Sequence, residues 1–156
     1  MPMSEYVAGM RDLIGHRMML LPAVSAIAVD GDGRVLLGLH ADTGRWSTIG
    51  GAIDPDESPL DAVAREVAEE LGVGIASAEI LGAYGGTRHR ARYPNGDESA
   101  FVTIAYLVRL DNHEFTYADA EIIETRWVSL DEMASLDLYD WIGDMLPDLR
   151  TRLGAR

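Results

Sequence analysis

The chain of 156 residues contains no cysteine and no lysine. The absence of cysteine excludes disulfide bonds, zinc–thiolate sites and thiol nucleophiles. All thirteen basic side chains are arginine. Any phosphate contact would therefore be made by a guanidinium group, which binds phosphate oxygens in a forked geometry.

Long hydrophobic runs are also missing. The apolar stretch at residues 18–29 is interrupted by Pro22 and is too short to cross a bilayer. The first seventeen residues include Glu5, Arg11 and Asp12, which argues against a signal peptide. We therefore predict a cytoplasmic protein with no membrane partner.

Positive charge is scarce, with 13 basic against 26 acidic residues and a net charge of −13. This balance disfavours a nucleic acid polymer as partner, because polymer binding needs a basic surface. Much of the negative charge is concentrated: between Asp54 and Gly72 stand seven acids and one base. The length predicts a single domain over residues 1–156.

The acidic segment has the pattern of a helix over residues 59–71. Ser58 is a suitable N-cap, Pro59 suits the first helical position and Gly72 suits the stop. Apolar residues recur at helical spacing and predict one buried side; they are Leu60, Val63, Val67 and Leu71.

Three glutamates, Glu66, Glu69 and Glu70, stand three and four residues apart in this helix and share one face. Like charges this close repel one another, and only Arg65 lies beside them. On a helical wheel they flank the apolar stripe, so we expect them to face a cleft. Hard oxygen ligands in such a cluster favour a divalent cation, most naturally Mg²⁺ with Mn²⁺ as a substitute.

The segment from Gly51 to Val73 resembles the Nudix (MutT-like) signature. Its specified positions are Gly51, Glu57, Arg65, Glu66, Val67, Glu69, Glu70, Gly72 and Val73. The resemblance implies an α+β fold, an α/β/α sandwich with a mixed sheet between helices. Residues 51–73 would form the loop–helix–loop of the Nudix box, and residues 1–20 a helical N-terminal extension.

The resemblance also implies site roles. Glu66 and Glu70 would be the main metal ligands, and Glu69 a third ligand or the base that acts on water. The carbonyl of Gly50 and the carboxylate of Glu121 would join the metal site, while Glu57 and Arg65 would form a supporting ion pair. Relatives usually carry Leu-Pro before the two glycines, where this chain has Thr48-Ile49. The missing proline leaves one torsion unfixed and puts the position of the Gly50 carbonyl in doubt.

Elsewhere, the patterns predict a helix at 4–15 and strands at 24–29, 35–39, 80–93, 99–110 and 121–128. A turn at 94–96 would join two of these strands in a hairpin, and short helices are expected at 130–135 and 139–152. Strands mixed with helices favour a mixed sheet covered by helices.

Five further residues are candidate substrate contacts: Arg45, Trp46, Arg88, Arg90 and Arg92. The three arginines at 88–92 alternate, so in a strand they would share one face. That face is either a phosphate clamp or an exposed or dimer surface pairing with acids. Trp46 either stacks on a base or caps the core.

The resemblance implies hydrolysis of the diphosphate bond in a nucleoside diphosphate derivative, with ADP-ribose or a nucleotide sugar as the leading substrate. Water would attack phosphorus. A first alternative is a pyrophosphohydrolase that removes pyrophosphate from nucleoside triphosphates. A second is a module that senses a nucleotide without hydrolysis. The resemblance also favours a homodimer.

Overall fold

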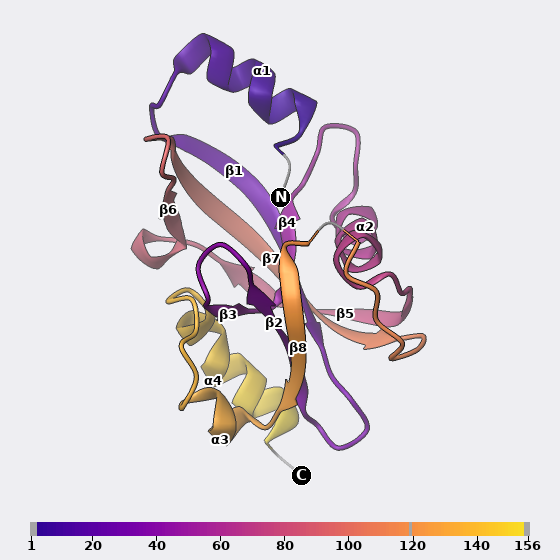
Figure 1. Cartoon of the computed structure of the whole chain (residues 1–156). Coiled ribbons are helices and arrows are strands. Elements are labelled where there is room, and N and C mark those ends of the chain that lie inside the picture. Colours follow the sequence, from indigo (N-terminus) through magenta and orange to yellow (C-terminus); the bar gives the residue numbers. More distant parts are fainter. Residues whose placement is uncertain (1–2, 119, 155–156) are drawn as a thin grey trace.

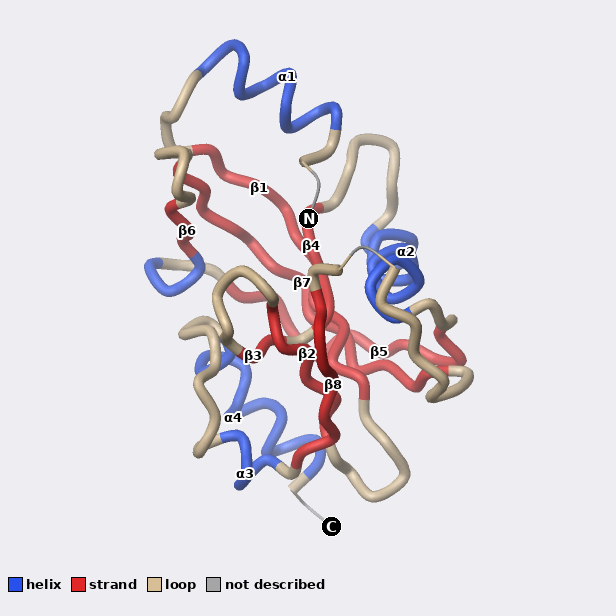
Figure 2. The backbone as a smooth tube through the Cα atoms, viewed as in Figure 1, coloured by secondary structure: helices blue, strands red, loops and turns tan. Residues whose placement is uncertain are grey.

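The computed structural model describes residues 3–118 and 120–154. Eight strands are distributed over two sheets, and helices cover both sides (Figures 1 and 2). The predicted α+β sandwich is confirmed, with the difference that the strands form two sheets in place of one.

The larger sheet has five strands: β1 (Met19–Ala28), β4 (Ile49–Ala52), β5 (Ile75–Tyr84), β6 (Arg90–Arg92) and β7 (Glu98–Leu110). Their order is β4–β1–β7–β5, with β6 also paired to β7. The β1–β7 pair is parallel and the other pairs are antiparallel, so the sheet is mixed as predicted.

The smaller sheet has three strands in the order β3–β2–β8, all antiparallel: β2 (Val35–His40), β3 (Trp46–Ser47) and β8 (Ile122–Val128). A turn stabilised by the Asp30 carboxylate joins β1 to β2, because this carboxylate accepts hydrogen bonds from the backbone N–H groups of Asp32 and Arg34. The chain passes back to the larger sheet between β3 and β4.

The helices are α1 (Glu5–Ile14), α2 (Pro59–Leu71), α3 (Leu130–Met133) and α4 (Ile142–Leu153), with a 3₁₀ turn, η1, at Thr87–His89. Alternate residues of β1 face opposite sides of the sheet. Val24 and Ala26 belong to one apolar cluster with α2, while Ile27 belongs to a second cluster with α3 and α4. The structure therefore has two cores, one on each side of β1.

Several predicted boundaries were wrong. The first strand begins at Met19 and contains Pro22. This proline lies just beyond the last β1–β4 pair, where its carbonyl accepts a hydrogen bond from the Ile53 N–H and it has no N–H to donate in return. The expected strand at 80–93 is two strands, because Gly86 takes a φ of 106° that no strand residue adopts. Residues 19–20 belong to β1, so the helical extension ends earlier than expected.

None of the helices in the described part of the chain combines the length and hydropathy needed to span a bilayer. Helix α1 forms within the predicted range 4–15, with Gly15 as its C-cap. None of its residues is buried. It is attached mainly by Arg11, which donates hydrogen bonds to the carbonyl of Glu98 at 2.7 Å and to the Ser99 hydroxyl at 2.9 Å. His16 contacts Asp97 at 2.7 Å, so the α1 region is tied to the hairpin that leads into β7.

Candidate active site

Helix α2 forms over the residues that the sequence predicted. The Ser58 hydroxyl accepts a hydrogen bond from the Asp61 N–H at 3.1 Å, and Pro59 occupies the first turn. At the other end Gly72 takes a left-handed conformation with φ 70°. A Cβ at Gly72 would lie 2.0 Å from the Thr116 hydroxyl, so glycine is required there for space as well.

The apolar stripe of α2 is buried from Val63 onward. Val63, Val67 and Leu71 are fully enclosed against the sheet, whereas Leu60 is 52% exposed. The prediction that Leu60 belongs to the buried stripe was therefore wrong, because this residue in the first helical turn does not pack on the core.

Two of the three box glutamates are buried along with this stripe. Glu66 is 1% exposed and Glu70 is 2% exposed, while the side chain of Glu69 is 52% exposed. Ionised carboxylates are seldom enclosed to this degree unless a cation or several donors compensate them. The burial of Glu66 and Glu70 therefore points to a function beyond solubility.

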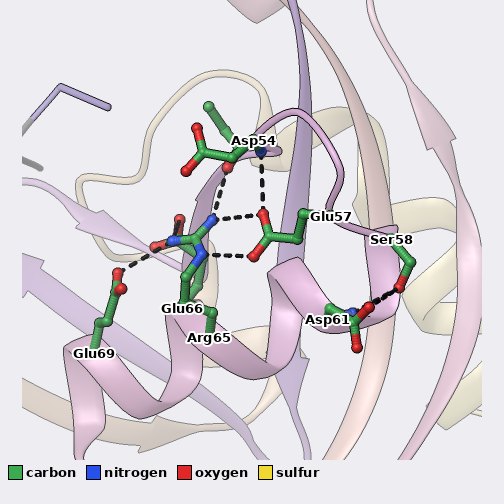
Figure 3. A network of polar contacts seen from close by, with 8 residues as sticks. Asp54, Glu57, Ser58, Asp61, Arg65, Glu66 and Glu69 are labelled. Carbon is green, nitrogen blue, oxygen red and sulfur yellow. Dashed lines mark hydrogen bonds and ion pairs between the residues drawn. The ribbon is translucent and has the colours of Figure 1, made fainter. Parts of the chain in front are cut away.

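Arg65 is the centre of the polar network on this face (Figure 3). Its Nε donates to Glu57 Oε1 at 2.7 Å and its Nη2 to Glu57 Oε2 at 3.0 Å, a forked pair. Its Nη1 donates to Glu66 at 2.8 Å and to Glu69 at 3.1 Å. Nη2 also donates to the carbonyl of Ala52 at 3.0 Å, which ties α2 to the end of β4.

The electrostatics follow from these contacts. The hydrogen bonds from Arg65 lower the pKa of the Glu57 carboxyl, and the same contacts, led by that to Glu57, raise the pKa of Arg65. Burial raises the pKa of Glu66, and the hydrogen bond from Arg65 only partly opposes this effect. Glu66 thus lacks full compensation of its negative charge.

The donor set suits a hard dication by its chemistry, since it consists of carboxylate oxygens, two of them on enclosed side chains. Among residues 3–118 and 120–154, however, no three acidic or histidine side chains converge at metal-ligand spacing. Glu66 and Glu69 both point to the Arg65 guanidinium, which supplies positive charge at this place. The residues fit a cation, but their side chains are not gathered around one point.

Gly50 lies in β4 opposite Ser25 of β1. A Cβ at Gly50 would lie 2.2 Å from the Val24 carbonyl oxygen, so the two backbones approach more closely than any other residue would allow. Glu121, the other expected ligand, directly precedes β8 and is half-buried, and its carbonyl accepts a hydrogen bond from the Ala41 N–H at 2.8 Å.

Arg45 and Trp46 contact other segments of the protein. Arg45 donates to Asp137 at 3.2 Å and to Asp140 at 3.0 Å, and it lies over the ring of Tyr139. Trp46 is 8% exposed and belongs to the core that contains α4, with the Arg126 guanidinium over its ring. Of the two readings of Trp46, its environment matches the one in which it caps the core.

The three arginines at 88–92 do not share one strand face. Arg88 lies in η1 and pairs with Asp144 at 3.2 Å. Arg90 and Arg92 lie in β6, where both are exposed, and Arg92 is 3.9 Å from Glu98. The structure thus separates Arg88 from the other two.

Sequence reasoning missed one buried polar contact next to the glycine turn. The hydroxyl groups of Ser25 and Thr48 lie 2.5 Å apart, and both residues are almost fully enclosed. The unusual Thr48 before the glycines marked this position, but nothing in the sequence identified Ser25 as its partner.

Comparison with known proteins identifies the family. The NUDIX domain model matches residues 19–149, which is most of the chain. The protein therefore belongs to the Nudix family. Its box helix, with the paired Glu57 and Arg65, is the segment that the sequence signature had indicated.

Two relatives show how much sequence the chain shares with known proteins. A MutT-like protein of Streptomyces ambofaciens is 42% identical over 65 residues, 42% of each chain. An RNA pyrophosphohydrolase of Acidiphilium cryptum is 32% identical over 124 residues, covering 67% of this chain and 72% of the relative. The match spans less than half of the Streptomyces protein.

Two solved structures have the same fold. The MutT protein of Methanosarcina mazei aligns with a TM-score of 0.69 at 23% identity, over 90% of this chain and 99% of the other. The NUDIX domain of Shewanella oneidensis NrtR, in complex with ADP ribose, aligns with a TM-score of 0.67 at 24% identity, over 97% and 99% of the two chains. These likenesses concern the fold.

Proposed function

We propose that this protein is a metal-dependent pyrophosphohydrolase that cleaves the diphosphate bond of a nucleoside diphosphate derivative, with ADP-ribose or a nucleotide sugar as substrate. The observation that carries the proposal is the burial of Glu66 and Glu70 on the box helix beside a fixed Arg65. Two enclosed carboxylates on a helix with no catalytic task would only cost stability.

Glu66 and Glu70 would hold a divalent cation, Mg²⁺ or Mn²⁺, with the carbonyl of Gly50 and the carboxylate of Glu121. When bound, the cation supplies positive charge that offsets the diphosphate and polarises the bond to be broken. Glu69 is either a further ligand or the base that takes a proton from the attacking water. Its side chain is half-exposed and contacts the Arg65 guanidinium at 3.1 Å.

The Glu57–Arg65 pair has a positioning role. Its forked geometry fixes the guanidinium, and the contact with the Ala52 carbonyl fixes the glycine-rich strand relative to α2. The five candidate substrate contacts stay predictions. Arg90 and Arg92 lie exposed in β6, with Arg92 3.9 Å from Glu98, whereas Arg45 and Arg88 pair with acids of the C-terminal segment.

Support for ADP-ribose comes from the Shewanella NUDIX domain, which was crystallised with that compound. A substrate panel tests the choice. Purified protein with Mg²⁺ or Mn²⁺ is incubated with ADP-ribose, nucleotide sugars, nucleoside triphosphates and a 5′-triphosphate RNA, and the phosphate products are identified. AMP from ADP-ribose supports the proposal, whereas pyrophosphate from a triphosphate supports the first alternative.

Glu70→Gln tests the carboxylates directly. Since a metal or a base needs the charged oxygen, we expect turnover to fall by roughly 10²–10⁴-fold with the fold retained. Glu79→Gln is the matched control, because Glu79 makes only an exposed ion pair with Arg152. Equal activity of the folded Glu70→Gln protein and the wild type would refute the site assignment. Nucleotide binding without any turnover by the wild type would favour the sensing module.

A further inference from the structure

Thr48 is the residue at which the chain changes sheets. Residues Trp46–Ser47 form β3 of the three-stranded sheet, and Ile49–Ala52 form β4 of the five-stranded sheet. Thr48 alone connects them. A change in its backbone torsions would shift β4 relative to β3, so its conformation acts together with the β1 ladder on the position of the β4 glycines.

A hydrogen bond to the centre of the larger sheet holds this residue. The Thr48 hydroxyl lies 2.5 Å from the hydroxyl of Ser25 on β1, and the two residues are 4% and 2% exposed. In the β1–β4 ladder Ser25 is opposite Gly50, so Ser25 and Thr48 are diagonal neighbours across the strand pair. The bond therefore joins the sheet crossover to the strand position that faces Gly50.

Gly50 has no side chain whose contacts could hold its backbone in position. Its backbone lies so close to β1 that an added Cβ would meet the Val24 carbonyl oxygen at 2.2 Å and the Ser25 Cα at 3.0 Å. The position of Gly50 is consequently set by its neighbours: the fully buried Ile49 on one side and the β1 ladder on the other. A proline at residue 49 would have fixed one torsion here, and this chain has none.

We propose that the Ser25–Thr48 hydrogen bond is a positioning device that fixes the backbone of Gly50. This inference rests on the proposed function in one respect, namely that the Gly50 carbonyl is a metal ligand. Ser25 and Thr48 are not among the proposed metal ligands. They act through the backbone, as supporting groups around a metal site do.

The test removes both hydroxyl groups together. In Ser25→Ala/Thr48→Val no buried hydroxyl is left without its partner, and valine keeps the shape of threonine, so the melting temperature should stay close to that of the wild type. The matched control Ser135→Ala/Thr151→Val makes the same two chemical changes on the C-terminal helical segment, where each hydroxyl donates to a nearby carbonyl.

Two measurements decide the outcome: Mn²⁺ affinity followed by electron paramagnetic resonance, and hydrogen exchange of the Gly51 amide without metal. In the double variant we expect Mn²⁺ binding to weaken on the order of 10-fold, the magnitude typical for supporting groups of a metal site. The Gly51 amide, which faces β1, should exchange faster. Thr48→Ser keeps the hydroxyl and should behave as the wild type.

Unchanged Mn²⁺ affinity and unchanged exchange at Gly51 in the folded double variant would overturn the positioning role, as would an equal loss in the control. If the double variant does not fold, Ser25→Ala alone also removes the bond; because it leaves the buried Thr48 hydroxyl without Ser25 as partner, its melting temperature is measured beside its Mn²⁺ affinity. A wild-type protein that neither binds Mn²⁺ nor hydrolyses any substrate of the panel would refute the proposed function instead, and the amide exchange would still decide the role of the hydroxyl pair.

Discussion

Replacing Arg65 by lysine keeps the positive charge at the centre of the box but removes the forked hydrogen-bonding geometry of the guanidinium. The guanidinium donates five hydrogen bonds, to Glu57 twice, to Glu66, to Glu69 and to the Ala52 carbonyl. An ammonium group has three donors and no fork, so Arg65→Lys loses at least two of these bonds. Arg65→Met also removes the charge. The Glu66 carboxylate, which is 1% exposed, then loses its hydrogen bond from the Arg65 guanidinium.

A hydrogen bond to a charged group contributes about 1.5–3 kcal/mol to the free energy of unfolding. The Arg65 side chain is 27% exposed, so solvent reduces this contribution and we expect Arg65→Lys to lower the free energy of unfolding by about 2 kcal/mol. For Arg65→Met we expect about 3–5 kcal/mol, since one partner of an enclosed ion pair is removed. Arg150→Lys, which alters an exposed contact with Asp131, should stay within about 0.5 kcal/mol.

The assay is urea unfolding at pH 7 in metal-free buffer, repeated at lower pH. Burial already raises the pKa of Glu66, and loss of Arg65 raises it further. A carboxyl whose pKa is raised in the folded state is destabilising at high pH and recovers as it is protonated, so the deficit of Arg65→Met should shrink as the pH falls. Arg65→Lys as stable as wild type, or an Arg65→Met deficit independent of pH, would refute this account of the network.

Three further predictions follow from the same structure. Hydrogen bonds from Arg65 lower the pKa of Glu57 in the folded state, so Glu57 stabilises the fold above the ordinary carboxyl pKa of 4.5, and this contribution is lost as the pH falls through the lower folded value. Glu57→Gln should therefore reduce the loss of stability at acid pH in a pH–stability curve. An unchanged loss at acid pH would contradict this. Gly50→Ala should lower the free energy of unfolding by about 2 kcal/mol or more in a thermal melt, since its Cβ would overlap the Val24 carbonyl; a neutral effect would show that β1 and β4 separate easily. Asp97→Asn should weaken the contact with His16 and speed hydrogen exchange in α1 while α2 keeps its protection; equal exchange in both proteins would contradict the proposed attachment of α1.

The Nudix box could be predicted from the sequence because the residues that define it lie close together in the chain. Capping by Ser58, the stop at Gly72 and the spacing of the three glutamates lie within or beside one helix, so the pattern predicted α2 correctly. That the three glutamates face a cleft stays a prediction. The Glu57–Arg65 pair, implied by the resemblance, is also present. The sequence alone did not show that Arg65 would also contact Glu66 and Glu69.

Features that depend on distant segments were harder to predict. The arginines at 88–92 alternate as in a strand, but Gly85 and Gly86 interrupt the strand and place Arg88 in a 3₁₀ turn. Trp46 packs in the apolar cluster that contains residues of α3 and α4, which no pattern near Trp46 in the sequence could indicate. The Ser25–Thr48 contact likewise depends on the register between β1 and β4, which the sequence does not encode in a readable form.

The parallel pairing of β1 with β7 has a consequence for how the chain folds. These strands are adjacent in space from Met19–Ser99 to Ala28–Val108, so each contact closes a loop of about eighty residues. Contacts of such large sequence separation slow folding, because the entropy of closure is lost before the contacts form. During synthesis the box helix would emerge well before β7, and we expect its two enclosed glutamates to stay hydrated until β7 completes the sheet that lies beneath them.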